Sequence, residues 1–163
     1  MNQIKADDTK KCVACRANTP LGVFTALYEN GMIRRVLFPD EPCPQNFTEV
    51  DDTLPFAMQI NEYFAGKRRR FTLPIVIPGT PFRQSVYRAV IDIPYGHTAS
   101  YSQAALAAGY PLAMRAVGTA MKMNQLPLLI PCHRVVHKAA KLEAYRGGLD
   151  IKSYLLTLEA NHR

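Results

Sequence analysis

The sequence predicts an α+β fold, in which an N-terminal lobe holds a small antiparallel sheet with one helix and a C-terminal lobe is helical. Three observations predict it. Alternating apolar residues flank an Asn30-Gly31 turn, apolar residues recur at helical spacing in the second half, and the chain-breaking pair Pro78-Gly79 lies between these patterns. We therefore expect a flexible leader over residues 1–18, an N-terminal α/β lobe over 19–78 and a C-terminal lobe over 79–163.

The first expected elements form a hairpin. Residues 19–28 and 32–38 carry the β-branched and aromatic side chains typical of strands, and the Asn30-Gly31 turn between them favours the positive φ that a tight hairpin requires. Residues 39–53 are rich in proline and acidic groups, so they are expected to form a loop. The N-terminal lobe therefore opens with antiparallel sheet.

A helix is expected over residues 54–65, where apolar side chains recur at helical spacing and Gly66 follows as a stop. The basic run over 67–70 fits two interpretations, a solvated end beside the negative helix C-terminus or a patch that binds nucleic acid. Residues 71–77 are expected to form another strand, in which Pro74 indicates an edge or a bend.

Two longer helices are expected in the C-terminal lobe. Thr80 is suited to cap the N-terminus of a helix over 81–92, and Pro81 fits its first position. A final helix is expected to follow Gly147-Gly148, because Asp150 suits its positive N-terminal end and leucines recur behind it.

A helix-turn-helix is expected between these two helices. Ser100 and Gln103 form a capping-box pattern at the start of a helix over 101–108, and a glycine-containing turn leads to a second helix over 112–122. The side chains of the second helix are mostly small and uncharged, and such a surface suits close approach to DNA. Helix pairs in ordinary protein cores look similar, so this pattern alone leaves both interpretations open.

Positive charge is concentrated in the second half of the chain. The 163 residues include 20 Lys plus Arg and 13 Asp plus Glu, a net charge of +7. Residues 1–79 hold ten basic and nine acidic side chains, and residues 80–163 hold ten basic and four acidic. The second half should attract polyanions, although many intracellular proteins are somewhat basic. Because no apolar run has the length of a membrane span and the N-terminus lacks the apolar core of a signal peptide, we expect a cytoplasmic protein.

Cys12 and Cys15 form a Cys-x-x-Cys pair, which occurs in zinc sites and in redox pairs. A zinc site needs two further ligands, and after Cys43 the next candidates are distant histidines. Four cysteines at irregular spacing do not form a secreted disulfide scaffold. We therefore expect no metal site and a poorly ordered, reduced pair.

The stretch over 128–136 places Cys132 between an apolar run and two basic residues. The thiolate is the nucleophilic form of cysteine; a histidine can take the proton, and a carboxylate can orient that histidine. His133 and Glu159 are candidates for these roles. The alternative is a buried structural thiol beside a core histidine. A cysteine hydrolase is disfavoured, because its base usually lies far from the nucleophile in sequence.

The motif Pro131-Cys132-His133-Arg134-Val135 closely resembles the active-site motif of the O6-methylguanine-DNA methyltransferases, a family of direct-reversal DNA repair proteins. Residues 19–77 fit the variable N-terminal lobe of this family only loosely. Further matches follow in order through most of residues 80–159, and they are Thr80-Pro81-Phe82, Ile93-Pro94-Tyr95-Gly96, Ser100-Tyr101, Arg115-Ala116-Val117-Gly118, Asn124, Gly147-Gly148-Leu149, Lys152, Leu155-Leu156 and Glu159.

The resemblance implies a catalytic set. Cys132 would attack the alkyl group on O6 of guanine in line and keep it as a thioether, so each molecule would act once and need no cofactor. His133 would accept the thiol proton through a water, and Glu159 would hydrogen-bond the imidazole. Tyr101 would donate to N3 of the guanine as negative charge grows on the ring. Asn124 would brace the turn between the recognition helix and the active site.

The resemblance also implies how DNA is bound. The second helix of the helix-turn-helix would enter the minor groove, and Arg115 would fill the place in the base stack that a flipped nucleotide leaves. The residues expected to contact DNA are Ala113, Met114, Arg115, Ala116, Gly118 and Tyr101. The residues expected to line the substrate pocket are Pro127, Val135, Tyr145 and Arg146. The backbone carbonyls of Cys132 and Val135 would read the exocyclic amine of the base.

Several positions depart from the family pattern. Met114 replaces a small residue, so it makes the groove-facing surface bulkier or acts as an apolar wedge. Ala140 and Ala144 replace glycines, which costs on the order of 1 kcal/mol each where positive φ is needed. Arg146 stands where serine or alanine is usual, and there it would bind a phosphate or obstruct bulky alkyl groups. Arg134 is expected to be structural and paired with a carboxylate.

The function implied by the resemblance is stoichiometric transfer of a methyl or small alkyl group from O6-alkylguanine, and from O4-alkylthymine, in double-stranded DNA to Cys132. The protein would act as a monomer without an obligatory protein partner, in the cytoplasm or in a eukaryotic nucleus. Two alternatives belong to other classes. Alkyltransferase-like proteins bind the damage without repairing it, but they usually carry tryptophan in place of the cysteine, and this chain has none. A transcription regulator would use the helix-turn-helix on an undamaged operator.

Overall fold

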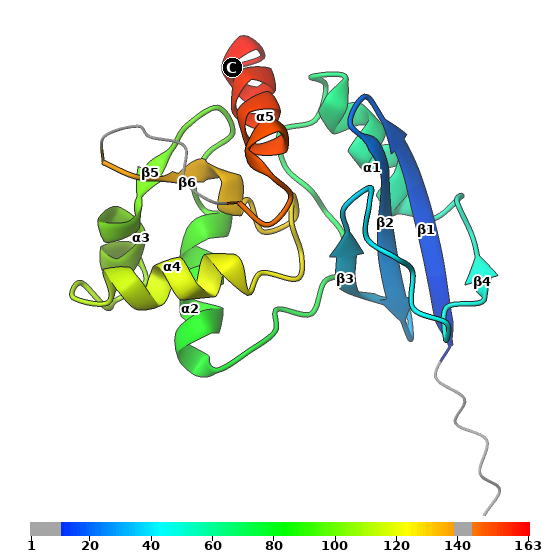
Figure 1. The fold of residues 1–163 in the computed structure, drawn as a ribbon, viewed down its shortest axis with the longest axis horizontal. Helices are drawn as coiled ribbons and strands as arrows, with labels where there is room; N and C mark the ends of the chain where they lie inside the picture. Colours follow the sequence, from blue (N-terminus) through cyan, green and yellow to red (C-terminus); the bar gives the residue numbers. More distant parts are fainter. Residues whose placement is uncertain (1–10, 139–144) are drawn as a thin grey trace, which may run out of the picture.

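A computed structural model describes residues 11–138 and 145–163, and it joins a four-stranded sheet to a helical region (Figure 1). The mixed α+β class predicted from the sequence is confirmed. In Figure 1 the sheet lies on one side of the molecule, while the helices of the C-terminal half gather on the other side. Ala140 and Ala144, two of the departures from the family pattern, lie outside the described residues.

The sheet has the strand order β3-β2-β1-β4. Strands β1 (Cys12–Thr19), β2 (Gly22–Glu29) and β3 (Met32–Leu37) run antiparallel, and the short β4 (Glu49–Val50) pairs in parallel with β1. Asn30 has a φ of 51° and Gly31 a φ of 77°, the left-handed conformations that the β2–β3 turn needs. The predicted hairpin is therefore confirmed.

The N-terminal half differs from the prediction at both ends. Residues 12–18, expected in a flexible leader, belong to β1, and the single strand expected over 19–28 is interrupted by a turn at Pro20 and Leu21. Small residues such as alanine and cysteine dominate β1, so its β propensity is weak and only pairing with β2 reveals it.

Residues 71–77 form no named strand. They run alongside β3 through one parallel bridge between Ile33 and Ile75, where the Ile33 amide donates to the Pro74 oxygen over 2.7 Å. Proline has no amide hydrogen, so this segment cannot pair fully along its length. The expected loop over 39–53 contains β4.

Alternation along β1 and β2 gives the sheet two unlike faces. One face packs Phe24 and Cys15 against helix α1 (Pro55–Phe64), from which Phe56 and Ile60 project. The opposite face buries a small cluster. Cys12 and Cys15 are three residues apart on an extended strand, so they point to opposite faces and do not form a chelating or redox pair. The expectation of a poorly ordered pair is wrong, since Cys15 is fully buried.

Two helices of the second half, α2 and α3, begin as their sequence signals predict. In α2 (Pro81–Ile91), the Thr80 hydroxyl accepts from the Arg83 amide over 3.3 Å. The capping box at α3 (Tyr101–Ala107) is formed: the Ser100 hydroxyl accepts from the Gln103 amide over 3.1 Å. Helix α4 (Met114–Lys122) starts two residues later than predicted. Within the described part of the chain, no helix is long and apolar enough to cross a membrane.

The remaining elements place the cysteine segment. A 3₁₀ turn (Cys132–Arg134) leads into β6 (Val135–Val136), which pairs in parallel with β5 (Ala99–Ser100) just before α3. The last helix, α5 (Leu149–Asn161), lies between the C-terminal helices and α1 (Figure 1). The cysteine segment is thereby held between α3 and α5.

Candidate active site

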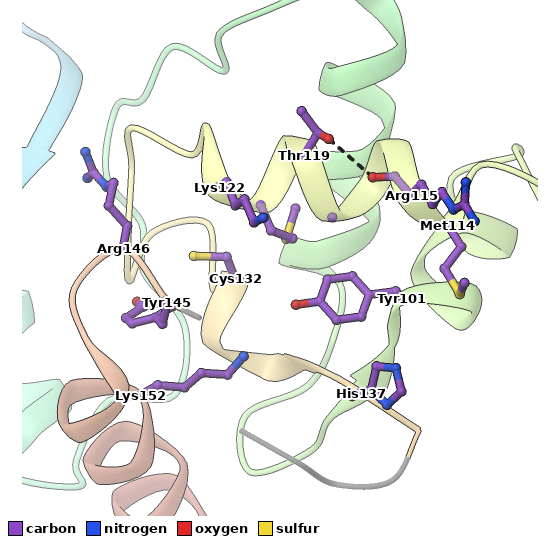
Figure 2. Close-up of a pocket in the computed structure, with 12 residues that line it drawn as sticks. Tyr101, Met114, Arg115, Thr119, Lys122, Cys132, His137, Tyr145, Arg146 and Lys152 are labelled. Atoms are coloured by element: carbon purple, nitrogen blue, oxygen red, sulfur yellow. Dashed lines mark hydrogen bonds between the residues drawn. The ribbon is translucent and has the colours of Figure 1, made fainter. Parts of the chain in front are cut away.

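A pocket of about 310 Å³ opens beside Cys132 (Figure 2). Its walls come from α3, α4 and α5 and from the segment before α5. The residues that line it are Tyr101, Met114, Arg115, Gly118, Thr119, Met121, Lys122, Cys132, His137, Tyr145, Arg146 and Lys152. Cys132 is only 6% exposed, so its small accessible surface faces this pocket.

Asn124 holds the turn that delivers Cys132. Its Nδ2 donates to the Cys132 Sγ over 3.1 Å and to the Ile130 oxygen over 2.9 Å, and its Oδ1 accepts from the Leu126 amide over 2.9 Å. Leu128, in the same turn, has a φ of 69°, an unfavourable conformation for a branched residue that the surrounding contacts maintain. Asn124 therefore braces this turn and also contacts the thiol directly.

The thiol of Cys132 is not activated by its surroundings alone. Burial raises its pKa, and the Asn124 hydrogen bond and the positive charges of Lys152 and Arg146 oppose that rise without cancelling it. The thiol is therefore protonated at neutral pH. Its reaction as a nucleophile needs a base that removes the proton.

His133 and Glu159 meet in the interior, as predicted. The His133 Nε2 lies 2.7 Å from the Glu159 Oε1, and the two side chains are 0% and 1% exposed. Arg134 donates from Nε to Glu159 Oε2 over 2.9 Å, from one terminal nitrogen to Oε1 over 3.0 Å, and from the other to the Ile93 oxygen over 2.7 Å. The Gly96 amide donates to Oε2 over 3.0 Å. The predicted structural pairing of Arg134 is confirmed.

These contacts settle the protonation of the pair. Burial by itself would raise the pKa of Glu159, but the hydrogen bonds from His133 and Arg134 and the positive charge of Arg134 outweigh it and hold that pKa far below its usual range. Burial lowers the pKa of His133 more than Glu159 raises it. The imidazole is therefore neutral at neutral pH. Because its Nε2 donates to the carboxylate, Nδ1 carries the lone pair that can accept a proton.

The sequence analysis gave no role to two residues that make hydrogen bonds within the site. The Tyr63 hydroxyl, on α1, donates to Glu159 Oε1 over 2.6 Å, and Lys152 Nζ donates to the Val135 oxygen over 2.9 Å. Tyr63 shares the helical spacing of its apolar neighbours, so its sequence indicates only a core position. Lys152 offered a signal, because it matches the family pattern and is a lysine among the apolar residues of α5, where the structure leaves it 2% exposed.

The predicted DNA-contacting residues lie on and beside α4. Met114 and Arg115 are exposed at the edge of the pocket, and the Tyr101 ring points into it toward Cys132 (Figure 2). Gly118 lies against this ring, since a Cβ atom there would be 3.9 Å from a ring carbon. Ala116 is exposed on the same helix; Ala113 precedes its first residue. Neither alanine lines the pocket among the residues described.

The four residues predicted for the substrate pocket divide into two pairs. Tyr145 and Arg146 line the pocket, whereas Pro127 and Val135 are buried and are not among its described lining residues. The Arg146 guanidinium points away from Cys132 (Figure 2). It donates to Glu41 Oε1 over 3.1 Å and lies 5.0 Å from the centre of the Phe38 ring. Arg146 is therefore engaged by the turn after β3, an arrangement that neither sequence interpretation anticipated.

Comparisons with known proteins agree with this geometry. Residues 81–161 match the family model of the 6-O-methylguanine DNA methyltransferase DNA-binding domain. The chain is 43% identical over 153 residues to a constitutive methylated-DNA–protein-cysteine methyltransferase of Bacillus subtilis, covering 88% of this chain and 92% of that protein. The crystal structure of the Mycobacterium tuberculosis O6-methylguanine methyltransferase is similar, with a TM-score of 0.84 and 31% identity over 94% of this chain and 95% of that one. The M. tuberculosis OGT crystallised in complex with DNA has a TM-score of 0.84 and 32% identity, over 92% and 94% of the two chains.

Proposed function

Because the chain belongs to the family of methylated-DNA–protein-cysteine methyltransferases, we propose that it repairs DNA by moving the alkyl group of O6-alkylguanine irreversibly to Cys132. The observation that carries this proposal is the pocket beside Cys132, together with the neighbouring neutral His133, which is hydrogen-bonded to an ionised Glu159. In the reaction the bond between O6 and the alkyl carbon breaks, a sulfur–carbon bond forms, and the thiol proton leaves the sulfur. No cofactor is required, because the substrate carries the electrophile.

His133 is proposed as the base that takes the Cys132 proton through a water. Its Nδ1 is buried and finds no hydrogen-bond partner among the described residues, which supports this role. The ionised Glu159 would stabilise the imidazolium that forms. Tyr101 would donate to N3 of the guanine and stabilise the negative charge that develops on the leaving base.

The pocket lies within the protein, so in-line attack on a stacked base requires the damaged nucleotide to leave the duplex. We propose that α4 enters the minor groove and that Arg115 fills the vacated place in the stack. The exposure of Met114 and Arg115 at the pocket edge and the net charge of +7 support this docking. O4-alkylthymine, which also carries an alkyl group on a base oxygen, is proposed as a second substrate.

Base recognition is proposed to use the carbonyls of Cys132 and Val135. Each already accepts one internal hydrogen bond, from the Val135 amide and from Lys152 Nζ respectively. A carbonyl oxygen has two lone pairs, so each can accept one more donor from the exocyclic amine.

We also propose that Pro78-Gly79 divides an N-terminal lobe from the lobe that binds DNA and receives the alkyl group, since the family model begins at residue 81. The protein is also proposed to act as a monomer without an obligatory protein partner, as the family resemblance implies.

The transfer is tested by incubating the protein with duplex DNA that contains O6-methylguanine and weighing its cysteine peptides. We expect one methyl group on the Cys132 peptide, and we expect Cys132→Ala to bind the DNA without transfer. Cys43 is an exposed free thiol, so Cys43→Ala is the matched control and should react like the unchanged protein. Methyl transfer that persists in Cys132→Ala would refute the proposal. Tight binding without any mass change would favour a damage-binding module.

The docking of α4 is tested with Arg115→Ala. This change should slow transfer from duplex DNA and leave transfer from free O6-methylguanine base unchanged, because the free base needs no flipping. Arg88→Ala, an exposed arginine on α2, is the control. Equal losses on the duplex and on the free base would contradict the proposed role of Arg115.

A further inference from the structure

The Oε1 atom of Glu159 accepts hydrogen bonds from two separate parts of the fold. Its Oε1 accepts from His133 over 2.7 Å and from Arg134 over 3.0 Å, and both donors belong to the 3₁₀ turn that carries Cys132. The third donor, the Tyr63 hydroxyl at 2.6 Å, comes from α1 and is separated from Glu159 by 96 positions in the sequence. The N-terminal half therefore contributes a side chain to the histidine–carboxylate pair although it contributes none of the described residues that line the pocket.

Other buried tyrosines show what a purely structural hydroxyl does in this core. The Tyr87 hydroxyl donates to the backbone oxygen of Ala120 over 2.9 Å. The Tyr95 ring packs on Tyr63 with a centroid distance of 5.8 Å, yet its buried hydroxyl has no hydrogen-bond partner within residues 11–138 and 145–163. Tyr63 differs from both, because its hydroxyl meets an ionised carboxylate on the same oxygen that faces the imidazole.

We propose that Tyr63 is a positioning residue for the transfer reaction, whose hydroxyl fixes Glu159 and weakens the pull of Oε1 on the His133 proton, so that the imidazole stays neutral and able to accept the proton of Cys132. This inference rests on the function proposed above. The hydroxyl lies 3.5 Å from His133 Nε2, so it acts at the shared oxygen rather than through a strong bond to the ring.

The physical reason is competition for one oxygen. A donor on Oε1 withdraws negative charge from it, and Oε1 then stabilises an imidazolium less strongly. The pKa of Tyr63 agrees with this role. Burial and the nearby negative charge of Glu159 raise that pKa well above its ordinary value, so the hydroxyl keeps its proton and donates it to the carboxylate in a hydrogen bond. The titratable and charged groups around His133 are Glu159 and Lys152 on α5, Arg134 and Cys132 in the 3₁₀ turn, and Tyr63 on α1.

The test is the pH dependence of single-turnover methyl transfer at saturating DNA. Tyr63→Phe keeps the ring and removes the donor, so Oε1 should stabilise the imidazolium more strongly. We expect the acid limb of the rate profile to move to higher pH by about half a unit, which lowers the rate on that limb about threefold. The plateau rate at higher pH and the affinity for DNA should stay within about twofold of the unchanged protein. Tyr95→Phe is the matched control, because it removes a neighbouring buried hydroxyl that has no described partner.

A second variant keeps the test decisive if Tyr63→Phe does not fold. Site-specific 3-fluorotyrosine at position 63 retains the hydroxyl and makes it a stronger donor, so the acid limb should move to lower pH. A profile for Tyr63→Phe that matches Tyr95→Phe, a uniform fall in rate without a shift, or no shift with fluorotyrosine would overturn the inference. If the unchanged protein fails to methylate Cys132, the proposed function itself fails, which separates the two outcomes.

Discussion

Arg134→Met tests how much the buried ion cluster stabilises the protein. Arg134 is 6% exposed and makes two hydrogen bonds to Glu159, at 2.9 and 3.0 Å, and one to the Ile93 oxygen at 2.7 Å. Methionine retains a long unbranched stem and removes all three bonds together with the positive charge. Since His133 is neutral, the carboxylate would then be held only by uncharged donors.

The magnitude follows from the burial of both partners. Breaking a buried ion pair by removing one partner leaves a charge without compensation and costs about 3–5 kcal/mol of unfolding free energy. For a chain of this size each kcal/mol lowers the melting temperature by about 2–4 °C, so we expect a fall of about 6–20 °C. The same change also removes the Arg134 donor from the part-buried Ile93 oxygen, which adds to the loss.

Arg16→Met is the matched control for this measurement. Arg16 also binds a carboxylate through two nitrogens, with distances of 2.7 and 3.1 Å to Asp52 Oδ2, but the two side chains are 54% and 41% exposed. Water and salt screen such a pair, so its loss should barely change stability. Both variants are compared by urea unfolding at neutral pH and by thermal unfolding. Equal losses in the two variants would refute the reasoning, because burial would then not determine the contribution of the pair.

Three further predictions concern the pocket and its pH dependence. Asn124→Ala removes a hydrogen bond that lowers the pKa of Cys132, so thiol titration should show a higher pKa and single-turnover transfer should slow by about tenfold. Glu41→Gln removes the charged partner of Arg146, so the guanidinium should turn toward the pocket and slow transfer of a benzyl group more than transfer of a methyl group; an unchanged ratio of the two rates would contradict this. The pKa of Glu159 is lower in the folded protein than in the unfolded chain, so its stabilisation is complete above about pH 4.5 and is lost as the pH falls below that value. Glu159→Gln should therefore flatten the acid side of the stability profile measured by urea unfolding.

Elements determined by neighbouring residues could be predicted from the sequence. The Asn30-Gly31 turn, the Thr80 cap and the Ser100–Gln103 capping box each depend on contacts within four residues, and all three are present. Strand β1 and the extended segment over 71–77 were not predicted correctly, because their pairing depends on partners elsewhere in the chain.

The candidate site likewise contains parts that could be predicted from the sequence and parts that depend on distant residues. The motif around Cys132 and the family resemblance pointed to His133 and Glu159, which lie together as predicted. The part played by Tyr63 could not be predicted, because a tyrosine at an apolar helical position looks the same whether or not its hydroxyl meets a carboxylate. The direction of Arg146 likewise depends on Glu41, which lies 105 positions away in the sequence.

The bond between Tyr63 and Glu159 also bears on what constitutes the smallest working unit of this protein. A fragment over 81–163 would contain all the described residues that line the pocket, and it includes the whole stretch matched by the family model. Such a fragment would lack the Tyr63 hydroxyl that donates to Glu159, and it would expose to water the side of α5 that packs against the N-terminal half. Unfolding of α1 would impose the same penalty on the intact chain, so both halves should melt in one cooperative step. We therefore expect the unit of cooperative folding to extend beyond residues 81–161, the stretch that the family model matches.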